Sequence, residues 1–263
     1  MPENRLRVPG ATLHYEVQGS GPVLVLIPAA FMGASAFEAV VPRLSEEYTV
    51  VTYDPRGLAR STVDEPGPMP PEMLADDVRL LIAEVSDGPA YVFGTSNGAI
   101  NGLSLAARHP EAVRTLVAHE PPVVELLPER EEYRAEGERV MAVHREKGAI
   151  AAMQAFMVGA GFAEEEGGEP QPWMLMMEKD IDVFYGRIYP ALRGFVPDVA
   201  ALRAGPAKVV VAGGIESKGE TAHRAAAAAA AELGTPLMDF PGDHGSFTAD
   251  PEAFAQALRE ALH

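Results

Sequence analysis

The spacing of apolar residues predicts two kinds of element in the first half of the chain. Residues 22–27 form a continuous apolar run, as in a parallel strand that is buried on both faces. Residues 11–17 alternate apolar and polar side chains, which indicates a half-exposed strand. Residues 36–44 and 71–85 have helical spacing, and Pro71 suits the first turn of a helix.

The same two patterns continue to the end of the chain. Further strands are predicted at residues 48–53, 90–93, 113–118, 207–212 and 236–240. Further helices are predicted at residues 99–108, 220–233 and 251–262. Strands that alternate with helices in this way predict an α/β fold, with a mostly parallel sheet that is covered by helices on both faces.

One long segment interrupts the alternation. Residues 121–205 lack the strand pattern and are predicted to form several helices. We therefore expect a core domain made of residues 1–120 and 206–263, and an inserted helical cap made of residues 121–205. Residues 163–168, with three glutamates and two glycines, are expected to form a mobile loop within the cap.

The most informative motif is Gly94-Thr95-Ser96-Asn97-Gly98. It lies between a predicted strand and a predicted helix, which is the context of a nucleophile elbow. A serine on so tight a turn has a strained backbone, and side chains two residues away on either side would collide, so glycines are needed there. The turn presents the hydroxyl of Ser96 above the sheet. It also directs the backbone N–H of Asn97 toward a developing oxyanion.

A serine nucleophile needs a base and a carboxylate that orients the base. Among the seven histidines, His244 is the candidate base, because it lies in a glycine-containing loop between the last predicted strand and the last helix. Two acids follow strands that come after the elbow. Glu120 ends one strand and is followed by Pro121-Pro122, whereas Glu216 follows the next strand. The residues alone leave both acids open.

The second oxyanion donor is expected in the loop that follows residue 27. Small side chains at Ala29 and Ala30 leave this backbone accessible, so we assign the N–H of Ala30, with Phe31 as the next candidate. The polar segment 54–61 follows another strand and is expected to form a buried network of ion pairs and turns.

The predicted cap is rich in methionine and aromatic residues. Most of these side chains are expected to form the core of the cap. Others are expected to line an apolar pocket above the elbow, where flexible methionines adapt to a bulky ligand. The residues expected to bind substrate are Phe31, Met153, Met157, Trp173, Tyr185 and Tyr189.

Composition narrows the functional classes. The formal net charge of −17 argues against a nucleic-acid or anionic-membrane partner, because phosphate binding needs a basic patch. The absence of cysteine excludes disulfides, thiolate metal sites and a cysteine nucleophile. No metal site is expected. Residues 1–5 lead into a strand with no apolar signal segment, and no apolar run approaches the length of a membrane span, so we expect a cytoplasmic protein. The oligomeric state is open, and it includes a possible homodimer.

These residues resemble the α/β-hydrolase fold family over essentially the whole chain. The resemblance rests on the elbow, the segment 54–61, the loop Pro241-Gly242-Asp243-His244 and the start of the last helix at Pro251. It implies an eight-stranded sheet, a helical cap after the sixth strand and no cofactor.

Within that family, the chain is most similar to the zearalenone lactone hydrolases. Their catalytic glutamate lies in a His-Glu-Leu-Pro context, and His119-Glu120-Pro121-Pro122 matches that position. The resemblance thus favours Glu120 over Glu216, and it places the oxyanion donors at Ala30 and Asn97. The cap sequence from Tyr185 to Pro190 is also similar. The chain departs from these enzymes at Tyr185, at Ala29-Ala30 and at Gly245-Ser246, which affects the expected substrate and not the fold.

The leading hypothesis is a serine hydrolase that cleaves a carboxylic ester or lactone of a bulky apolar molecule, with zearalenone as the suspected type. A general carboxylesterase is an alternative. So is a non-hydrolytic enzyme on the same fold, such as a lyase, a cyclase or a perhydrolase of a biosynthetic pathway. A binding protein that has lost turnover is a third possibility, disfavoured by the apparently complete triad.

Overall fold

The computed structural model describes residues 4–160 and 168–263. Of the loop predicted at residues 163–168, only Gly168 lies within the described residues. None of the helices in the described part of the chain is long and apolar enough to cross a membrane.

A single mostly parallel sheet forms the centre of the fold. Its strands are β1 (Asn4–Val8), β2 (Ala11–Gln18), β3 (Val23–Ile27), β4 (Thr49–Asp54), β5 (Thr62–Val63), β6 (Ala90–Thr95), β7 (Val113–His119), β8 (Lys208–Gly214) and β9 (Met238–Phe240). Their spatial order is β1-β2-β4-β3-β6-β7-β8-β9, and the two-residue β5 pairs with β2. The pairs from β4 through β9 are parallel, whereas β1 and β2 pair antiparallel at one edge. The predicted α/β fold class is confirmed.

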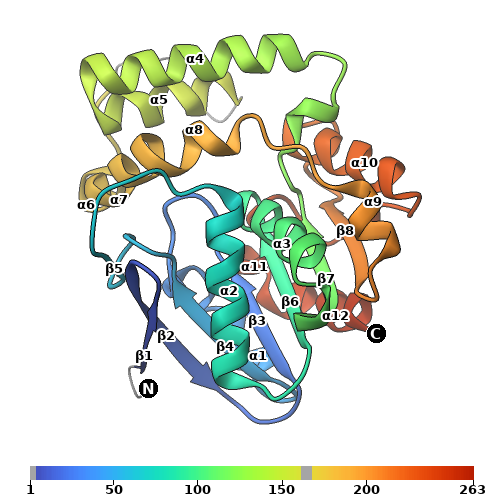
Figure 1. Cartoon of the computed structure of the whole chain (residues 1–263). Helices are drawn as coiled ribbons and strands as arrows, with labels where there is room; N and C mark the ends of the chain where they lie inside the picture. Colours follow the sequence, from blue (N-terminus) through green and yellow to red (C-terminus); the bar gives the residue numbers. More distant parts are fainter. Residues whose placement is uncertain (1–3, 161–167) are drawn as a thin grey trace.

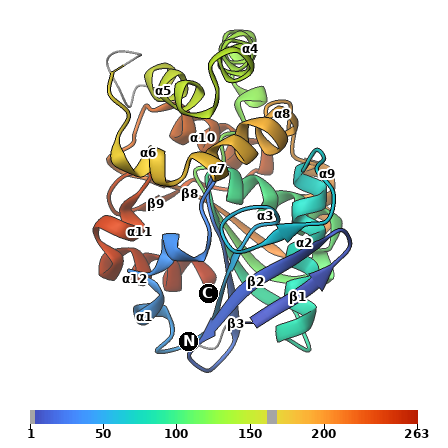
Figure 2. The same cartoon turned by 90° about the vertical axis from the view of Figure 1, so that its left-hand side faces the viewer.

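Helices cover both faces of this sheet and one of its ends. The α-helices are α1 (Val41–Leu44), α2 (Pro71–Val85), α3 (Asn97–Arg108), α4 (Arg130–Lys147), α5 (Ala149–Gly159), α6 (Pro172–Met176), α7 (Glu178–Val183), α8 (Tyr189–Leu192), α9 (Val199–Ala204), α10 (Thr221–Leu233), α11 (Ser246–Ala249) and α12 (Pro251–Leu262). The short helices are η1 (Ala34–Phe37), η2 (Pro110–Ala112), η3 (Val124–Leu126) and η4 (Phe184–Ile188), of which η4 is a π-helix. Helices α2 and α3 lie on one face, and α1 and α12 on the other (Figures 1 and 2).

The continuous apolar run in β3 follows from this layering. Val25 and Ile27 belong to the buried cluster on the α2 and α3 face, whereas Leu24 and Leu26 belong to the cluster on the α1 and α12 face. Successive strand side chains point to opposite faces, so a strand covered on both sides needs apolar residues at every position.

The helices from α4 to α8 lie together beyond one end of the sheet (Figure 1). Hydrogen bonds from backbone N–H groups are among the contacts that join them to the rest of the molecule. The N–H of Ala59 donates to the carboxylate of Asp180 over 3.1 Å, and the N–H of Met69 donates to the carbonyl of Arg187 over 2.9 Å. Helix α9 differs from this group, because it packs against α3 and α10.

The structure differs from the sequence prediction at three elements. The helix predicted at residues 36–44 is divided into η1 and α1, and α1 begins at Val41 with Pro42 in its first turn, where a missing N–H costs least. Strand β1 has two arginines on either side of one leucine, a pattern that suits an exposed edge and gives no apolar signal. Strand β5 contains only two residues, too few for a period to be visible.

Candidate active site

The strand-to-helix turn at Ser96 has the strained geometry expected of an elbow. Ser96 lies between β6 and α3 with φ 56° and ψ −128°. A Cβ atom on Gly94 would lie 2.4 Å from the carbonyl oxygen of Gly98, and one on Gly98 would lie 2.5 Å from those of Ile27 and Pro28. Both glycines are therefore required by backbone contacts, and the first turn of α3 lies directly against the end of β3.

The neighbouring strand brings Glu120 to the elbow. The N–H of Ser96 donates to the carbonyl of His119 over 2.9 Å, and His119 pairs with Thr95 in the register of β6 and β7. Glu120 follows at once with φ 47°, and its own N–H donates to Ala212 in β8 over 2.9 Å. The backbone at the ends of three parallel strands thus places Ser96 and Glu120 one strand apart.

The carboxylate of Glu120 is fully buried and has three polar partners. His244 Nδ1 lies 2.5 Å from its Oε2. The N–H of Gly214 donates to Oε1 over 2.9 Å, and the hydroxyl of Ser217 donates to the same oxygen. Glu216, the other candidate acid, is exposed. Its backbone N–H donates a hydrogen bond to the carbonyl of Gly242. The structure therefore brings His244 to Glu120, and it leaves the side chain of Glu216 at the surface.

Burial and hydrogen bonding act in opposite directions on this carboxylate. Burial alone would raise the pKa of Glu120, but the hydrogen bonds from His244 and Ser217 together lower that pKa to about 2. His119 lies beside it with its ring fully buried, and burial lowers the pKa of His119 to about 4. Near neutral pH, Glu120 is thus ionised and His119 is uncharged.

The predicted oxyanion donors lie side by side. The N–H of Ala30 donates to the side-chain Oδ1 of Asn97, and Ala30 has φ 44°. The backbone N–H of Asn97 is in the first turn of α3, where amides have no acceptor within the helix. A substrate oxyanion that binds Ala30 must replace an amide oxygen, an exchange that favours the charged acceptor because charge-assisted hydrogen bonds are stronger.

An ion-pair network around the buried carboxylate of Asp54, with Arg60 exposed, holds the loop that carries Ala30. Asp54, at the end of β4, accepts the N–H of Ala34 over 2.8 Å and the Nε of Arg60 over 2.7 Å. Arg60 also contacts Glu16 over 2.7 Å. A Cβ on Gly33 would lie 2.3 Å from Asp54 Oδ1, so the loop passes close over this carboxylate. The expected polar network at residues 54–61 is present.

The six residues expected to bind substrate form two groups, and the aromatic ring of a further residue, Phe184, connects them. Phe31 stacks on Trp173 at 6.0 Å between ring centroids. Tyr185 packs against Tyr189 at 5.4 Å, and its hydroxyl lies 3.5 Å from the sulfur of Met153. Phe184 contacts Phe31, Tyr185 and Tyr189. Met157 is half-buried and packs against the same apolar core.

Phe184 and Tyr185 belong to the π-helix η4, a geometry that often occurs at functional sites. Tyr185 is fully buried, whereas Trp173 and Tyr189 are half-buried. The rings therefore contribute to the core of the helical segment, and those of Trp173 and Phe184 also contact Phe31, which adjoins the candidate oxyanion donor.

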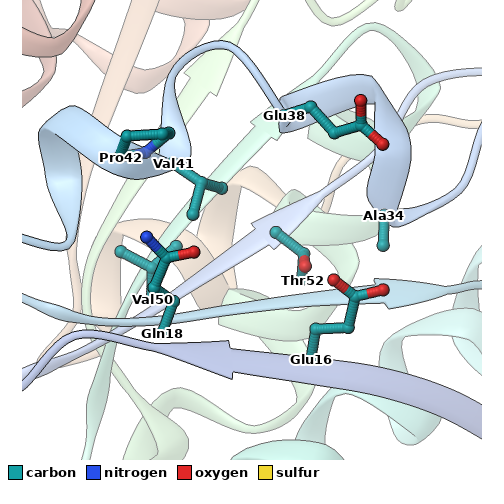
Figure 3. Close-up of a pocket in the computed structure, with 8 residues that line it drawn as sticks. All are labelled: Glu16, Gln18, Ala34, Glu38, Val41, Pro42, Val50 and Thr52. Atoms are coloured by element: carbon teal, nitrogen blue, oxygen red, sulfur yellow. The ribbon is translucent and has the colours of Figure 1, made fainter. Parts of the chain in front are cut away.

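A separate hollow of about 140 Å³ lies beside η1 and strands β2 and β4 (Figure 3). Two of the side chains around it are carboxylates, those of Glu16 and Glu38, and none is a candidate catalytic group. Ala34 connects its rim to the oxyanion loop. Among the described residues, no group of three or more histidine and acidic side chains is placed to hold a metal ion.

Comparison with known proteins identifies the family. A family model for the alpha/beta hydrolase fold matches residues 22–148. An uncharacterized hydrolase of Bacillus subtilis, YraK, is 34% identical over 266 residues, which cover 98% of this chain and 94% of that protein. The chain belongs to the α/β-hydrolase fold family.

Two further matches are more distant. The 2-(acetamidomethylene)succinate hydrolase of Mesorhizobium japonicum is 33% identical over 114 residues, which cover 43% of this chain and 41% of that one. The structure of a thermophilic esterase from Thermogutta terrifontis aligns with a TM-score of 0.76 and 19% identity, over 100% of this chain and 98% of the other. The hydrolase class is common to these relatives, and it is the class supported for this chain. None of the matches assigns a particular bond or substrate to it.

Sequence reasoning missed three contributors to this α/β-hydrolase site. The partners of the Glu120 carboxylate are Gly214, the last residue of β8, and Ser217 in the loop that follows, and no local pattern indicates either of them. Phe184 was one of many cap aromatics, and only the π-helix distinguishes it.

The close packing of the elbow predicts that adding one methyl group at Gly98 strongly destabilises the fold. Gly98→Ala is expected to lower the free energy of unfolding by about 3 kcal/mol, because the backbone carbonyls of β3 cannot move away. Gly88→Ala is the matched control, since a Cβ there meets nothing within 4 Å. Urea denaturation of the two variants measures the difference, and equal stabilities would contradict the geometry.

The burial of His119 predicts that the free energy of unfolding decreases as the pH is lowered. The unfolded chain binds a proton at this residue below pH about 6.5, and the folded protein does so only near pH 4, so the unfolded state holds more protons in between. The free energy of unfolding should fall by about 3 kcal/mol from this residue as the pH falls through that window. His119→Phe should remove this part of the decline in urea titrations. Parallel pH dependences of the two proteins would show that His119 does not carry it.

Proposed function

We propose that the protein is a serine hydrolase that cleaves a carboxylic ester or lactone through Ser96, His244 and Glu120. The observation that supports this most directly is the buried, ionised Glu120 against His244 Nδ1, one strand away from a serine at a strained elbow. A carboxylate on Nδ1 leaves Nε2 as the ring nitrogen that accepts a proton, which is the tautomer that a general base requires.

The proposed reaction has two halves. Ser96 Oγ attacks the substrate carbonyl while His244 takes its proton, and the N–H groups of Ala30 and Asn97 bind the tetrahedral oxyanion. His244 then gives the proton to the leaving alkoxide, and an acyl-enzyme forms. Water, activated by the same histidine, releases the acid. Glu120 remains ionised throughout and stabilises the imidazolium.

The proposed substrate is a neutral, bulky apolar molecule. Residues 121–205 act in this proposal as the cap, and its aromatic rings reach Phe31 beside the oxyanion loop. The excess of acidic side chains does not favour an anionic substrate. A zearalenone-type macrolactone is the specific candidate, on the strength of the His119-Glu120-Pro121-Pro122 context.

Amide cleavage is the second candidate reaction. One relative is named a 2-(acetamidomethylene)succinate hydrolase, so the fold also serves substrates with an acetamido group. The same serine, base and oxyanion donors can perform either acyl transfer, and the leaving group alone differs. An ester and its matching amide should therefore be compared on the same enzyme preparation.

Ser96→Ala is expected to lower turnover by a factor on the order of 10⁴ or more, because the nucleophile is lost while binding is retained. The protein and the variant are incubated with zearalenone and with p-nitrophenyl butyrate, and products are followed by mass spectrometry. A product heavier by one water, formed only by the unaltered protein, supports the lactonase. Turnover that survives in Ser96→Ala would instead favour non-hydrolytic chemistry on this fold.

The choice of acid is tested by two matched substitutions. Glu120→Gln should lower kcat about 10³-fold or more, since a neutral amide does not stabilise the imidazolium and permits the wrong tautomer. Glu216→Gln should change kcat by less than about twofold, because its side chain is exposed. Loss of activity in Glu216→Gln alone would overturn the assignment of Glu120.

A further inference from the structure

Ser217 is a fully buried serine that the proposed reaction does not use directly. It follows β8 by three residues, and its hydroxyl contacts both Glu120 Oε1 and, at 3.1 Å, the carbonyl of Gly214. A hydroxyl has one proton to donate. The ionised carboxylate is the stronger acceptor, so the proton is directed to Glu120.

The two oxygens of Glu120 have separate partners. Oε1 accepts from Ser217 and from the N–H of Gly214, whereas Oε2 faces His244 Nδ1. A partial rotation of the carboxylate out of this plane would weaken the bonds of both oxygens. The two donors on Oε1 therefore fix the plane of the carboxylate and hold the other oxygen against His244 Nδ1.

The loop after β8 holds Ser217 in this position. A Cβ on Gly214 would lie 2.5 Å from the carbonyl of Gly242 and 3.0 Å from the hydroxyl of Ser217, so the segments after β8 and β9 are packed closely together. The N–H of Glu216 donates to Gly242 and closes the same contact. The hydroxyl thus approaches Glu120 from a backbone that has little room to move.

We infer that Ser217 is a positioning residue, whose hydroxyl fixes the plane of the Glu120 carboxylate and holds it against His244. The inference rests on the proposed function, because it requires Glu120 to be the acid of the triad. Ser217 acts only through Glu120, and it does not meet the substrate.

The expected signature is a loss of reactivity that depends on the carboxylate of Glu120. The titratable groups that face Glu120 are His244 and His119, with Asp243 and His223 farther out around His119. Without the Ser217 donor, Oε1 keeps only the N–H of Gly214, so the carboxylate is held less firmly against His244 Nδ1.

The test uses the rate at which a fluorophosphonate labels Ser96, followed by intact-mass spectrometry from pH 5 to 9. This probe reports on the triad and does not depend on the natural substrate. Ser217→Ala is expected to label about tenfold more slowly at pH 7, because a hydrogen bond to a charged group is lost. Ser217→Cys retains the volume and a weaker donor, so its rate should be intermediate.

Ser246→Ala is the matched control. Ser246 is equally buried and lies close to the same histidine loop, but its hydroxyl has no hydrogen-bond partner among the described residues. Its labelling rate should stay within about twofold of the unaltered protein. Urea denaturation of every variant checks that each one is folded under the labelling conditions, so that the labelling rates of folded proteins are compared.

The outcomes separate the inference from the proposed function. In a Glu120→Gln background, Ser217→Ala should have little further effect, because both changes act on one interaction. Equal rates and equal pH profiles for Ser217→Ala and Ser246→Ala would overturn the inference alone. Unchanged labelling of Glu120→Gln, or no labelling of the unaltered protein, would overturn the proposed triad and the inference with it.

Discussion

The close backbone contact between the first turn of α3 and the end of β3 is the constraint on which the site depends. Gly98 lies so near the carbonyl oxygens of Ile27 and Pro28 that no side chain fits between them. This contact brings the turn that carries Ser96 and the loop that carries Ala30 to one place, although 67 positions separate Ala30 from Asn97. Because β6 lies between β3 and β7, the strand on its other side then supplies Glu120.

Strained backbone is concentrated at this junction. Four non-glycine residues among those described have positive φ, and three of them are Ala30, Ser96 and Glu120. Such conformations persist only where the surroundings over-determine them. Here each is held by a specific bond: Ala30 to Asn97, Ser96 to His119, and Glu120 to Ala212. The strained residues therefore lie in the candidate site, and the surrounding sheet holds them in these conformations.

The parts of this molecule that could be predicted from sequence are those whose cause is local. The buried strand at residues 22–27 and the elbow at Ser96 each follow from neighbouring residues, because covering layers and tight turns impose a pattern within a few positions. Ser217 could not be predicted, since its importance comes from a carboxylate 97 positions away. The break in the helix expected at residues 36–44 was missed for a related reason, because apolar spacing continues across it while Pro42 restarts the helix.

The two candidate acids show why local pattern cannot choose between them. Each follows a strand of the same sheet, so by spacing alone they are equivalent. They differ in surroundings: Glu120 is fully buried, and Glu216 is exposed. A buried carboxylate costs free energy unless several donors compensate it, and Glu120 has three. A protein retains that cost where a fixed charge in a poorly solvated place is useful, and in the proposed function this charge would stabilise His244 when the histidine becomes positive. The charge of an exposed carboxylate is screened by the solvent, so it would stabilise a positive histidine only weakly.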